Sequence, residues 1–189
     1  DAFNEMHDEE TIGDVSVEHQ MVMIRQICQG MEMLASQQVI HRDLAARNVL
    51  LFHFDPGDAV ATSVKVSDFG LSVGAYGRSH AYVRGVEVPI RYLAPEAIER
   101  GRFSEKTDVW AFGVTMWEIL TYGKIPYFEI PRDEDVITHV LGGERLQRPG
   151  GCPRLLWSIV ERCWAASPKA RPTFAQLSAM LGGPGVAQE

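Results

Sequence analysis

Several features that mark common protein classes are missing from this sequence of 189 residues. Its three cysteines, Cys28, Cys152 and Cys163, are far apart and form no C-x-x-C pair, which argues against a zinc site or a disulfide framework. There is no basic run, and the formal net charge of −7 argues against the positively charged surface typical of nucleic-acid-binding proteins. No apolar run reaches the roughly 18 residues that a membrane-spanning helix needs. The longest run, residues 109–120, is interrupted by Glu118.

The composition predicts the setting of the protein. A hydrophobic content of 46% and a charged content of 23% are typical of a soluble globular domain, or of part of one. Residues 1–14 are acidic and carry no secretory signal pattern. Unpaired thiols are typical of a reducing compartment. We therefore expect a cytoplasmic protein, or the cytosolic part of a membrane receptor whose span lies outside these residues.

Periodic patterns predict helices with one small hairpin. Ser16 is suited to capping a helix, and the residues after it place an apolar side chain at every third or fourth position: Val17, Met21, Ile24, Cys28, Met31 and Ala35. Residues 49–54 and 64–67 resemble short strands, and the turn-forming residues 55–58 lie between them, so we expect a hairpin with a long tip. Residues 71–93 show no periodicity and are expected to form a loop.

The second half of the chain is predicted to be helical. Residues 109–117 are apolar almost all round, which indicates a buried helix. Further helices are expected at 133–141, at 153–165 with Pro153 in the first turn, and at 173–181, where Thr173 and Gln176 form a capping-box pattern. Residues 182–189 are expected to form a flexible tail. The fold class is therefore α+β, mostly α.

Polar motifs stand out against this background. Residues 41–48 read His-Arg-Asp-Leu-Ala-Ala-Arg-Asn and lie between two short apolar runs. They are followed by Asp68-Phe69-Gly70 and then by Ala94-Pro95-Glu96. In this order the three motifs resemble the signature of the catalytic half of eukaryotic protein kinases. The resemblance covers residues 17–181 and implies the mostly helical carboxyl-terminal lobe of a kinase.

The resemblance assigns catalytic roles to specific residues. Asp43 would accept the proton of the substrate hydroxyl, while Asn48 and Asp68 would bind the Mg²⁺ ions that bridge the phosphates of ATP. Leu50 matches the apolar surface beneath the adenine. Arg47, in a loop that has Ala45 where serine/threonine kinases carry lysine, resembles the tyrosine-kinase branch. Proteins that bear tyrosine are thus the expected substrates.

Other residues match supporting positions of the family. Phe69 is expected to pack inside, and Gly70 supplies the backbone freedom that lets Asp68 move. Glu96 and Arg171 resemble the buried ion pair of the family. Asp108 is expected to hydrogen-bond the backbone of the catalytic loop.

Two further residues around the loop stand out. Tyr92 occupies a position where tyrosine kinases usually carry tryptophan. Tyr82 is the expected regulatory phosphorylation site, paired with Arg42. The alternative, that Tyr82 is an ordinary exposed loop tyrosine, remains open because its spacing from Pro89 is shorter than expected.

The family's glycine-rich loop, its Val-Ala-Ile-Lys strand and the partner glutamate have no counterpart in residues 1–189. We therefore expect a partial kinase domain whose partner is the missing amino-terminal lobe, and which is inactive without it.

Three alternatives remain beside a tyrosine kinase. A pseudokinase-like binding module would explain the missing motifs, although Asp43, Asn48 and Asp68 are retained. A serine/threonine kinase would differ in its acceptor residue. Residues 70–74, Gly-Leu-Ser-Val-Gly, also fit the nucleophile motif of serine hydrolases, with Ser72 followed by Asp133 and His139, but no helical pattern follows Ser72 as that motif requires.

Overall fold

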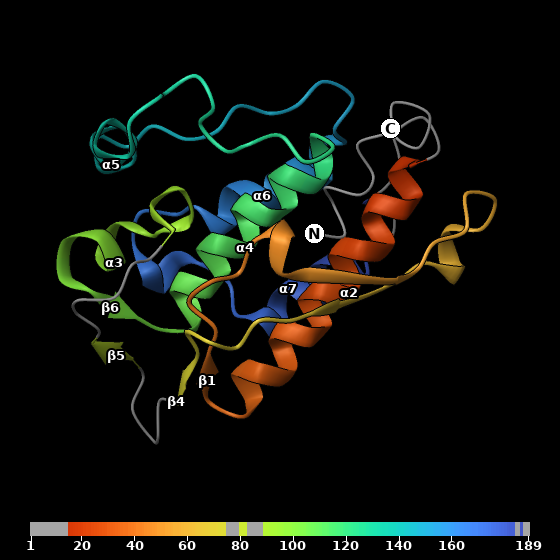
Figure 1. Cartoon of the computed structure of the whole chain (residues 1–189), viewed down its shortest axis with the longest axis horizontal. Coiled ribbons are helices and arrows are strands. Elements are labelled where there is room, and N and C mark those ends of the chain that lie inside the picture. Colours follow the sequence, from red (N-terminus) through yellow and green to blue (C-terminus); the bar gives the residue numbers. More distant parts are fainter. Residues whose placement is uncertain (1–14, 75–79, 83–88, 184–185, 187–189) are drawn as a thin grey trace.

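Two helices form the centre of the molecule in this computed structural model, which describes residues 15–74, 80–82, 89–183 and 186 (Figure 1). Helix α2 (Val17–Ser36) packs against α4 (Glu105–Leu120) and α7 (Phe174–Leu181), and α4 packs against α6 (Arg154–Cys163). Helix α5 (Asp133–Leu141) lies at the outer edge (Figure 1). None of the helices described is long and apolar enough to cross a membrane. The expected mostly helical lobe is confirmed.

Helix α4 is the most deeply buried element. Every residue from 107 to 120 is buried, as its nearly uniform apolar sequence predicted. At Gly113, an added Cβ atom would lie 2.7 Å from Nε1 of Trp164 and 2.8 Å from Cβ of Cys163. Glycine at this position therefore allows α4 to approach the end of α6 closely.

Helix α2 begins as the sequence predicted. The Oγ atom of Ser16 accepts the backbone N–H of His19 at 3.3 Å, and the backbone N–H of Ser16 donates to Nδ1 of His19 at 3.2 Å. This is a capping box in which histidine takes the place of the usual glutamate or glutamine. The predicted apolar stripe packs on the core, and the buried Gln20 donates to the carbonyl of Ile119 at 2.9 Å, which ties α2 to α4.

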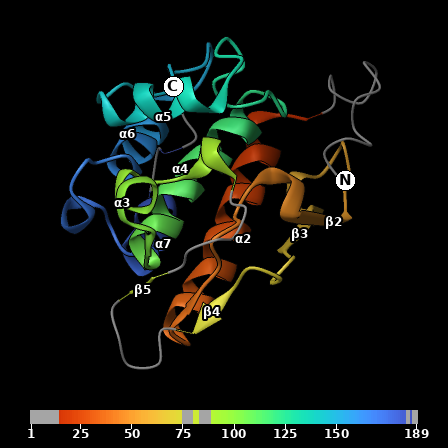
Figure 2. The ribbon, with the colours of Figure 1, turned by 60° about the vertical axis from the view of Figure 1, so that its left-hand side comes forward.

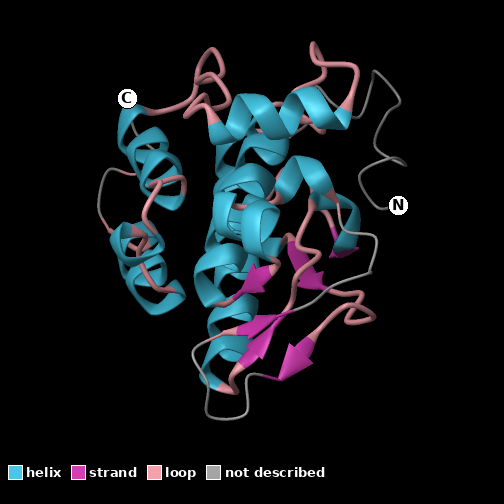
Figure 3. Cartoon of the chain, turned by 90° about the vertical axis from the view of Figure 1, so that its left-hand side faces the viewer, coloured by secondary structure: helices cyan, strands magenta, loops and turns pink. Residues whose placement is uncertain are grey.

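The described strands form short antiparallel pairs on one side of the helices (Figure 3). The predicted hairpin is confirmed as β2 (Val49–His53) paired with β3 (Ser63–Val66), with the 3₁₀ turn η2 (Ala59–Ala61) in its long tip. Two further pairs join β1 (Val39–Ile40) to β4 (Val73–Gly74) and β5 (Ala81–Tyr82) to β6 (Arg102–Phe103). These two-residue strands are too short to show a periodic pattern, so the sequence did not predict them.

The second half differs from expectation in detail. Helix α3 (Pro95–Arg100) was not predicted; it begins with proline and ends at Gly101, whose φ is 59°. Pro153 is the N-cap of α6, not part of its first turn, so that prediction was one residue early. The capping box of Thr173 and Gln176 at α7 is confirmed. The 3₁₀ turns η1 (Ala46–Asn48), η3 (Ile90–Tyr92) and η4 (Pro168–Ala170) complete the described elements.

The chain ends are only partly described. Residues 1–14 lie outside the described residues. In the expected flexible tail, Val186 is only 6% exposed and belongs to the core cluster, so the expectation needs correction at this residue. Burying its apolar side chain against the core removes it from water.

Candidate active site

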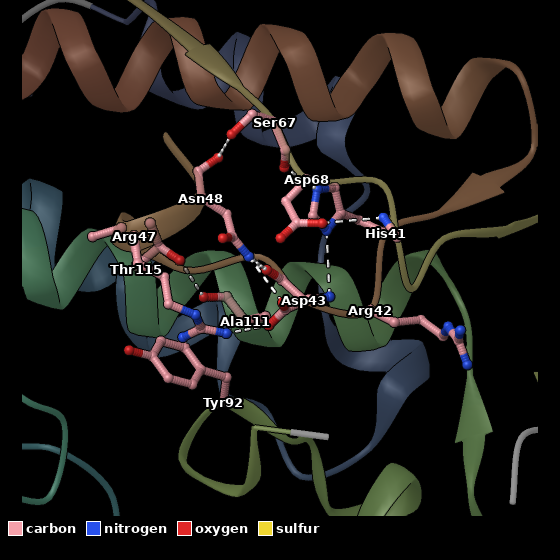
Figure 4. A network of polar contacts seen from close by, with 12 residues as sticks. His41, Arg42, Asp43, Arg47, Asn48, Ser67, Asp68, Tyr92, Ala111 and Thr115 are labelled. Carbon is pink, nitrogen blue, oxygen red and sulfur yellow. Dashed lines mark hydrogen bonds and ion pairs between the residues drawn. The ribbon is translucent and has the colours of Figure 1, made fainter. Parts of the chain in front are cut away.

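The motif at 41–48 lies between two strand pairs. It connects β1, which pairs with β4, to β2, which pairs with β3. Figure 2 shows β4 and the β2–β3 pair. The backbone N–H and the hydroxyl of Ser67 both donate to the carbonyl oxygen of Asn48, at 2.8 and 2.9 Å. The hairpin therefore brings Asp68, the residue after Ser67, next to Asn48 (Figure 4).

His41 links the two motifs as a neutral ring. Its Nδ1 atom accepts the backbone N–H of Asp43 at 3.3 Å, so the ring proton lies on Nε2, which is 3.1 Å from the carbonyl oxygen of Ser67. Burial lowers the pKa of His41 below its usual value, despite the opposing effect of the Ser67 carbonyl. The loop is thus joined to the residue before Asp68 by an uncharged side chain.

Asp43 is held by its neighbours in the loop. The amide nitrogen of Asn48 donates to the backbone carbonyl of Asp43 at 2.6 Å and to its Oδ2 atom at 2.9 Å. Arg47 donates to the other carboxylate oxygen of Asp43 (Figure 4). Since the nitrogen of the Asn48 amide is used by Asp43, its oxygen remains available as a ligand.

Asp68 presents an exposed carboxylate beside this group. It follows β3 with a φ of 60°, and its Oδ1 atom accepts the backbone N–H of Gly70 at 3.2 Å. Together with Asn48 it offers one carboxylate and one amide oxygen, and Mg²⁺ commonly combines such ligands with phosphate oxygens and water. In the described part of the chain, no group of three or more His, Cys, Asp or Glu side chains could hold a metal ion by itself. The donor set thus fits Mg²⁺ bound jointly with a phosphate.

The expectation that Phe69 packs inside is wrong. Its side chain is 50% exposed, with one face against His41 at a ring-centroid distance of 5.4 Å. The turn at Asp68, with its positive φ, directs the following residue away from the helical core. Among the described residues, the Phe69 ring therefore packs against His41 and is otherwise largely exposed.

Arg42 is placed differently from the regulatory prediction. Its Nε atom donates to the carbonyl of Leu71, and its guanidinium lies 5.6 Å from the ring centroid of Phe103. The Nη1 atom is buried and has no hydrogen-bond partner among the described residues. The backbone of Tyr82 lies opposite Arg102 in the β5–β6 pair, but the side chain of Tyr82 lies outside what the structure describes. The pairing of Arg42 with a phosphate on Tyr82 thus stays a prediction.

Asp108 anchors the loop as predicted. From the first turn of α4, its Oδ2 and Oδ1 atoms accept the backbone N–H groups of His41 at 2.8 Å and Arg42 at 3.0 Å. Burial raises the pKa of Asp108 to about 7, although these two donors act in the opposite direction.

A second anchor, Glu118, was missed by the sequence analysis. Its Oε2 atom accepts the backbone N–H of Ala46 at 2.9 Å, and its Oε1 atom accepts the hydroxyl of Tyr92 at 2.7 Å. The signal was present in the sequence, because Glu118 is the acidic residue that interrupts the apolar run at 109–120. A charged residue in a buried helix generally needs partners, and here the partners are the catalytic loop and η3.

The predicted ion pair of Glu96 and Arg171 is present. Nη1 and Nη2 of Arg171 donate to the two carboxylate oxygens of Glu96 at 2.7 and 2.9 Å. Backbone carbonyls of Ala165, Lys106 and Ala166 accept the remaining donors at 2.8, 2.9 and 3.4 Å. The pair ties α3 to the segment before α7, far from the predicted chemistry, and its role is structural.

The surface around the loop is open. Leu50, expected beneath an adenine ring, is 45% exposed on β2. A cavity of about 410 Å³ lies elsewhere, between the end of α2 and the start of α4, and its lining includes Gln38, Glu96 and Lys169 but none of the predicted catalytic residues. Apart from the loop itself, the described residues thus leave the predicted nucleotide surface uncovered.

The serine-hydrolase alternative is not supported. Ser72 is followed by strand β4, whereas a nucleophile elbow leads into a helix. The hydroxyl of Ser72 lies 3.5 Å from the backbone carbonyl of His41. Asp133 is instead paired with Arg91 at 3.0 Å, and the ring of His139 packs against that of Tyr127.

Comparisons with known proteins identify the family of the chain. A family described as protein tyrosine and serine/threonine kinase matches residues 6–181. The chain is 41% identical over 168 residues to the human protein named inactive tyrosine-protein kinase 7, covering 89% of this chain but 15% of that protein. It is 45% identical to tyrosine-protein kinase csk-1 of Caenorhabditis elegans, covering 83% and 28%, and 43% identical to tyrosine-protein kinase Shark of Drosophila melanogaster, covering 83% and 16%. The chain thus spans less than a third of the length of these relatives.

Proposed function

The chain belongs to the tyrosine-kinase branch of the protein tyrosine and serine/threonine kinase family, and on this premise we propose that it supplies the catalytic loop for phosphoryl transfer from ATP to tyrosine side chains of proteins. The observation that carries the proposal is the convergence of Asp43, Asn48 and Asp68. These residues come from two motifs twenty residues apart, and the β2–β3 hairpin brings them together (Figure 4).

In this proposal Asp43 acts on the substrate hydroxyl. Its carboxylate accepts the tyrosine proton while the phenolic oxygen forms a bond to the γ-phosphorus. The bond from that phosphorus to the bridging oxygen breaks, and ADP leaves. The hydrogen bonds from Asn48 and Arg47 orient the carboxylate before the substrate arrives.

Asp68 and the amide oxygen of Asn48 would bind Mg²⁺, and Leu50 would contact the adenine. Bound Mg²⁺ neutralises charge on the phosphates of the nucleotide. Because Asp68 is exposed, its carboxylate can reach a phosphate-bound ion without movement of the core.

Tyrosine as the acceptor rests on Arg47. Its guanidinium lies 5.2 Å from the ring centroid of Tyr92 and beside the carboxylate of Asp43, at the open side of the loop. A cation there can contact both a phenol ring and the transferred phosphate. Ala45, where serine/threonine kinases carry lysine, is fully buried.

A second candidate is a non-catalytic kinase-like module. The observation that favours it is the similarity to a relative named as inactive. The retained Asp43, Asn48 and Asp68 favour catalysis, because a binding module has no need of this set.

The proposal also extends to setting and partners. We place the activity in the cytosol, where the buried thiols of Cys28, Cys152 and Cys163 would stay reduced. The amino-terminal lobe of a kinase domain would cover Leu50 and Phe69. The 189-residue chain alone is therefore expected to show no useful turnover.

The test is a phosphoryl-transfer assay on a chimera that joins the amino-terminal lobe of csk-1 to this chain. With ATP, Mg²⁺ and a mixed protein substrate, phosphoamino-acid analysis should find mainly phosphotyrosine. Mainly phosphoserine would overturn the acceptor. Nucleotide binding without any transfer would favour the non-catalytic module.

A further inference from the structure

A closed network of contacts links Arg47 to Tyr92, Glu118 and Ala46. Its guanidinium pairs with Asp43 and lies over the ring of Tyr92, 5.2 Å from the centroid (Figure 4). The hydroxyl of Tyr92 donates to Glu118 at 2.7 Å, and Glu118 accepts the backbone N–H of Ala46 at 2.9 Å. Ala46 is bonded to Arg47 in the chain, so this network of contacts is closed.

Because Glu118 is buried, the network depends on each group that contacts it. Glu118 is only 7% exposed, and burial raises its pKa, while the Ala46 N–H, the Tyr92 hydroxyl and the charge of Arg47 act to lower it. Burial, followed by the nearby Glu118 carboxylate, raises the pKa of Tyr92, so its hydroxyl stays protonated and donates. Removing one donor would leave a carboxylate oxygen buried without a partner, and this is costly.

The hydroxyl group and the ring of Tyr92 contact different residues. The hydroxyl contacts Glu118 in α4, and the ring face contacts Arg47 in the loop. Tyr92 itself belongs to η3, the segment before α3, so a shift of η3 would disturb both contacts.

We infer that Tyr92 is a positioning residue for catalysis: its hydroxyl orients Glu118 to hold the loop at Ala46, and its ring holds Arg47 against Asp43. The placement of η3 is thereby transmitted to the carboxylate that contacts the substrate. The effect on phosphoryl transfer rests on the proposed function, whereas the coupling itself does not.

The coupling is tested on the 189-residue chain by nuclear magnetic resonance. Tyr92→Phe should speed hydrogen exchange of the Ala46 amide roughly 10- to 100-fold, since hydrogen bonds to charged groups are worth about 1.5–3 kcal/mol. The same variant should leave the ¹³Cζ shift of Arg47 nearly unchanged, because the ring remains. Tyr92→Leu should change both signals. Tyr122→Phe is the matched control, because Tyr122 is 42% exposed, and it should change neither.

The outcomes separate the inference from the proposed function. If Ala46 exchanges equally fast in Tyr92→Phe and Tyr122→Phe, the inference is wrong whatever the chain catalyses. In the csk-1 chimera, Tyr92→Phe should lower kcat about tenfold with an unchanged KM for ATP, as expected for loss of about 1.4 kcal/mol in the transition state only. If the unsubstituted chimera transfers no phosphate, the proposed function fails, and the exchange measurement still decides the coupling.

Discussion

Asp108 accepts the backbone N–H of Arg42 at 3.0 Å, and Arg42 has a φ of 69°, in the left-handed region that residues other than glycine rarely adopt. A buried carboxylate from α4 thus holds the turn that begins the catalytic loop. The helix supplies a rigid support, and the loop gains a backbone conformation that the residue would not prefer by itself.

This contact predicts a pH dependence of stability. Because the pKa of Asp108 is raised to about 7 in the folded chain, its stabilising contribution is complete below the unfolded value near 4 and is lost as the pH rises through 7. Relative to Asp108→Asn, the free energy of unfolding of the wild type should therefore fall between about pH 4 and 7, by at most about 1.4 kcal/mol per pH unit, and level off above 7. Urea unfolding at each pH measures it. His41 is present in both proteins, so its titration cancels, and parallel curves would refute the assignment.

Asp43→Asn in the csk-1 chimera should lower kcat by about 10²- to 10⁴-fold, the usual contribution of a positioned base. ATP binding should remain, because Asp43 is not a proposed metal ligand. Steady-state kinetics and a nucleotide-binding titration measure the two effects. Asp58→Asn, at the exposed hairpin tip, is the control and should retain activity. Near-normal turnover by Asp43→Asn would remove Asp43 from the mechanism.

The buried ion pair should be essential to stability. Glu96→Ala leaves the guanidinium of Arg171, which is 0% exposed on its side chain, without its charge partner, and should cost roughly 3–5 kcal/mol in the free energy of unfolding. Replacing both residues by Leu and Met should recover part of the loss. Asp135→Ala, which breaks the exposed pair with Arg132, is the control and should produce no measurable change. A small effect of Glu96→Ala in chemical denaturation would contradict this role.

Tyr82 is the expected regulatory phosphorylation site. Autophosphorylation should raise the activity of the csk-1 chimera. A phosphate on Tyr82 would supply an acceptor for Nη1 of Arg42, which has no hydrogen-bond partner among the described residues. Tyr82→Phe should abolish the increase, while Tyr122→Phe should preserve it. Activity time courses with and without preincubation in ATP measure the difference, and equal activation of both variants would show that Tyr82 is an ordinary loop residue.

The longer helices, the hairpin and the candidate site residues could be identified from the sequence. Periodic apolar positions predicted α2, the nearly uniform apolar run predicted α4, and cap residues such as Ser16 and Thr173 predicted where helices begin. These signals are local, so they can be read without knowing the fold. The motif resemblance added Asp43, Asn48 and Asp68.

Tertiary structure alone decided how the site is held. Glu118 is 72 positions from Ala46 and 26 from Tyr92, and neither spacing carries a local pattern. The exposure of Phe69 and the direction of Arg42 toward Leu71 likewise depend on which segments pack beside them. Contacts between distant segments form only when helix packing and strand register bring them together. For that reason the motifs pointed to the candidate groups, whereas only the fold determined which residues hold them in place.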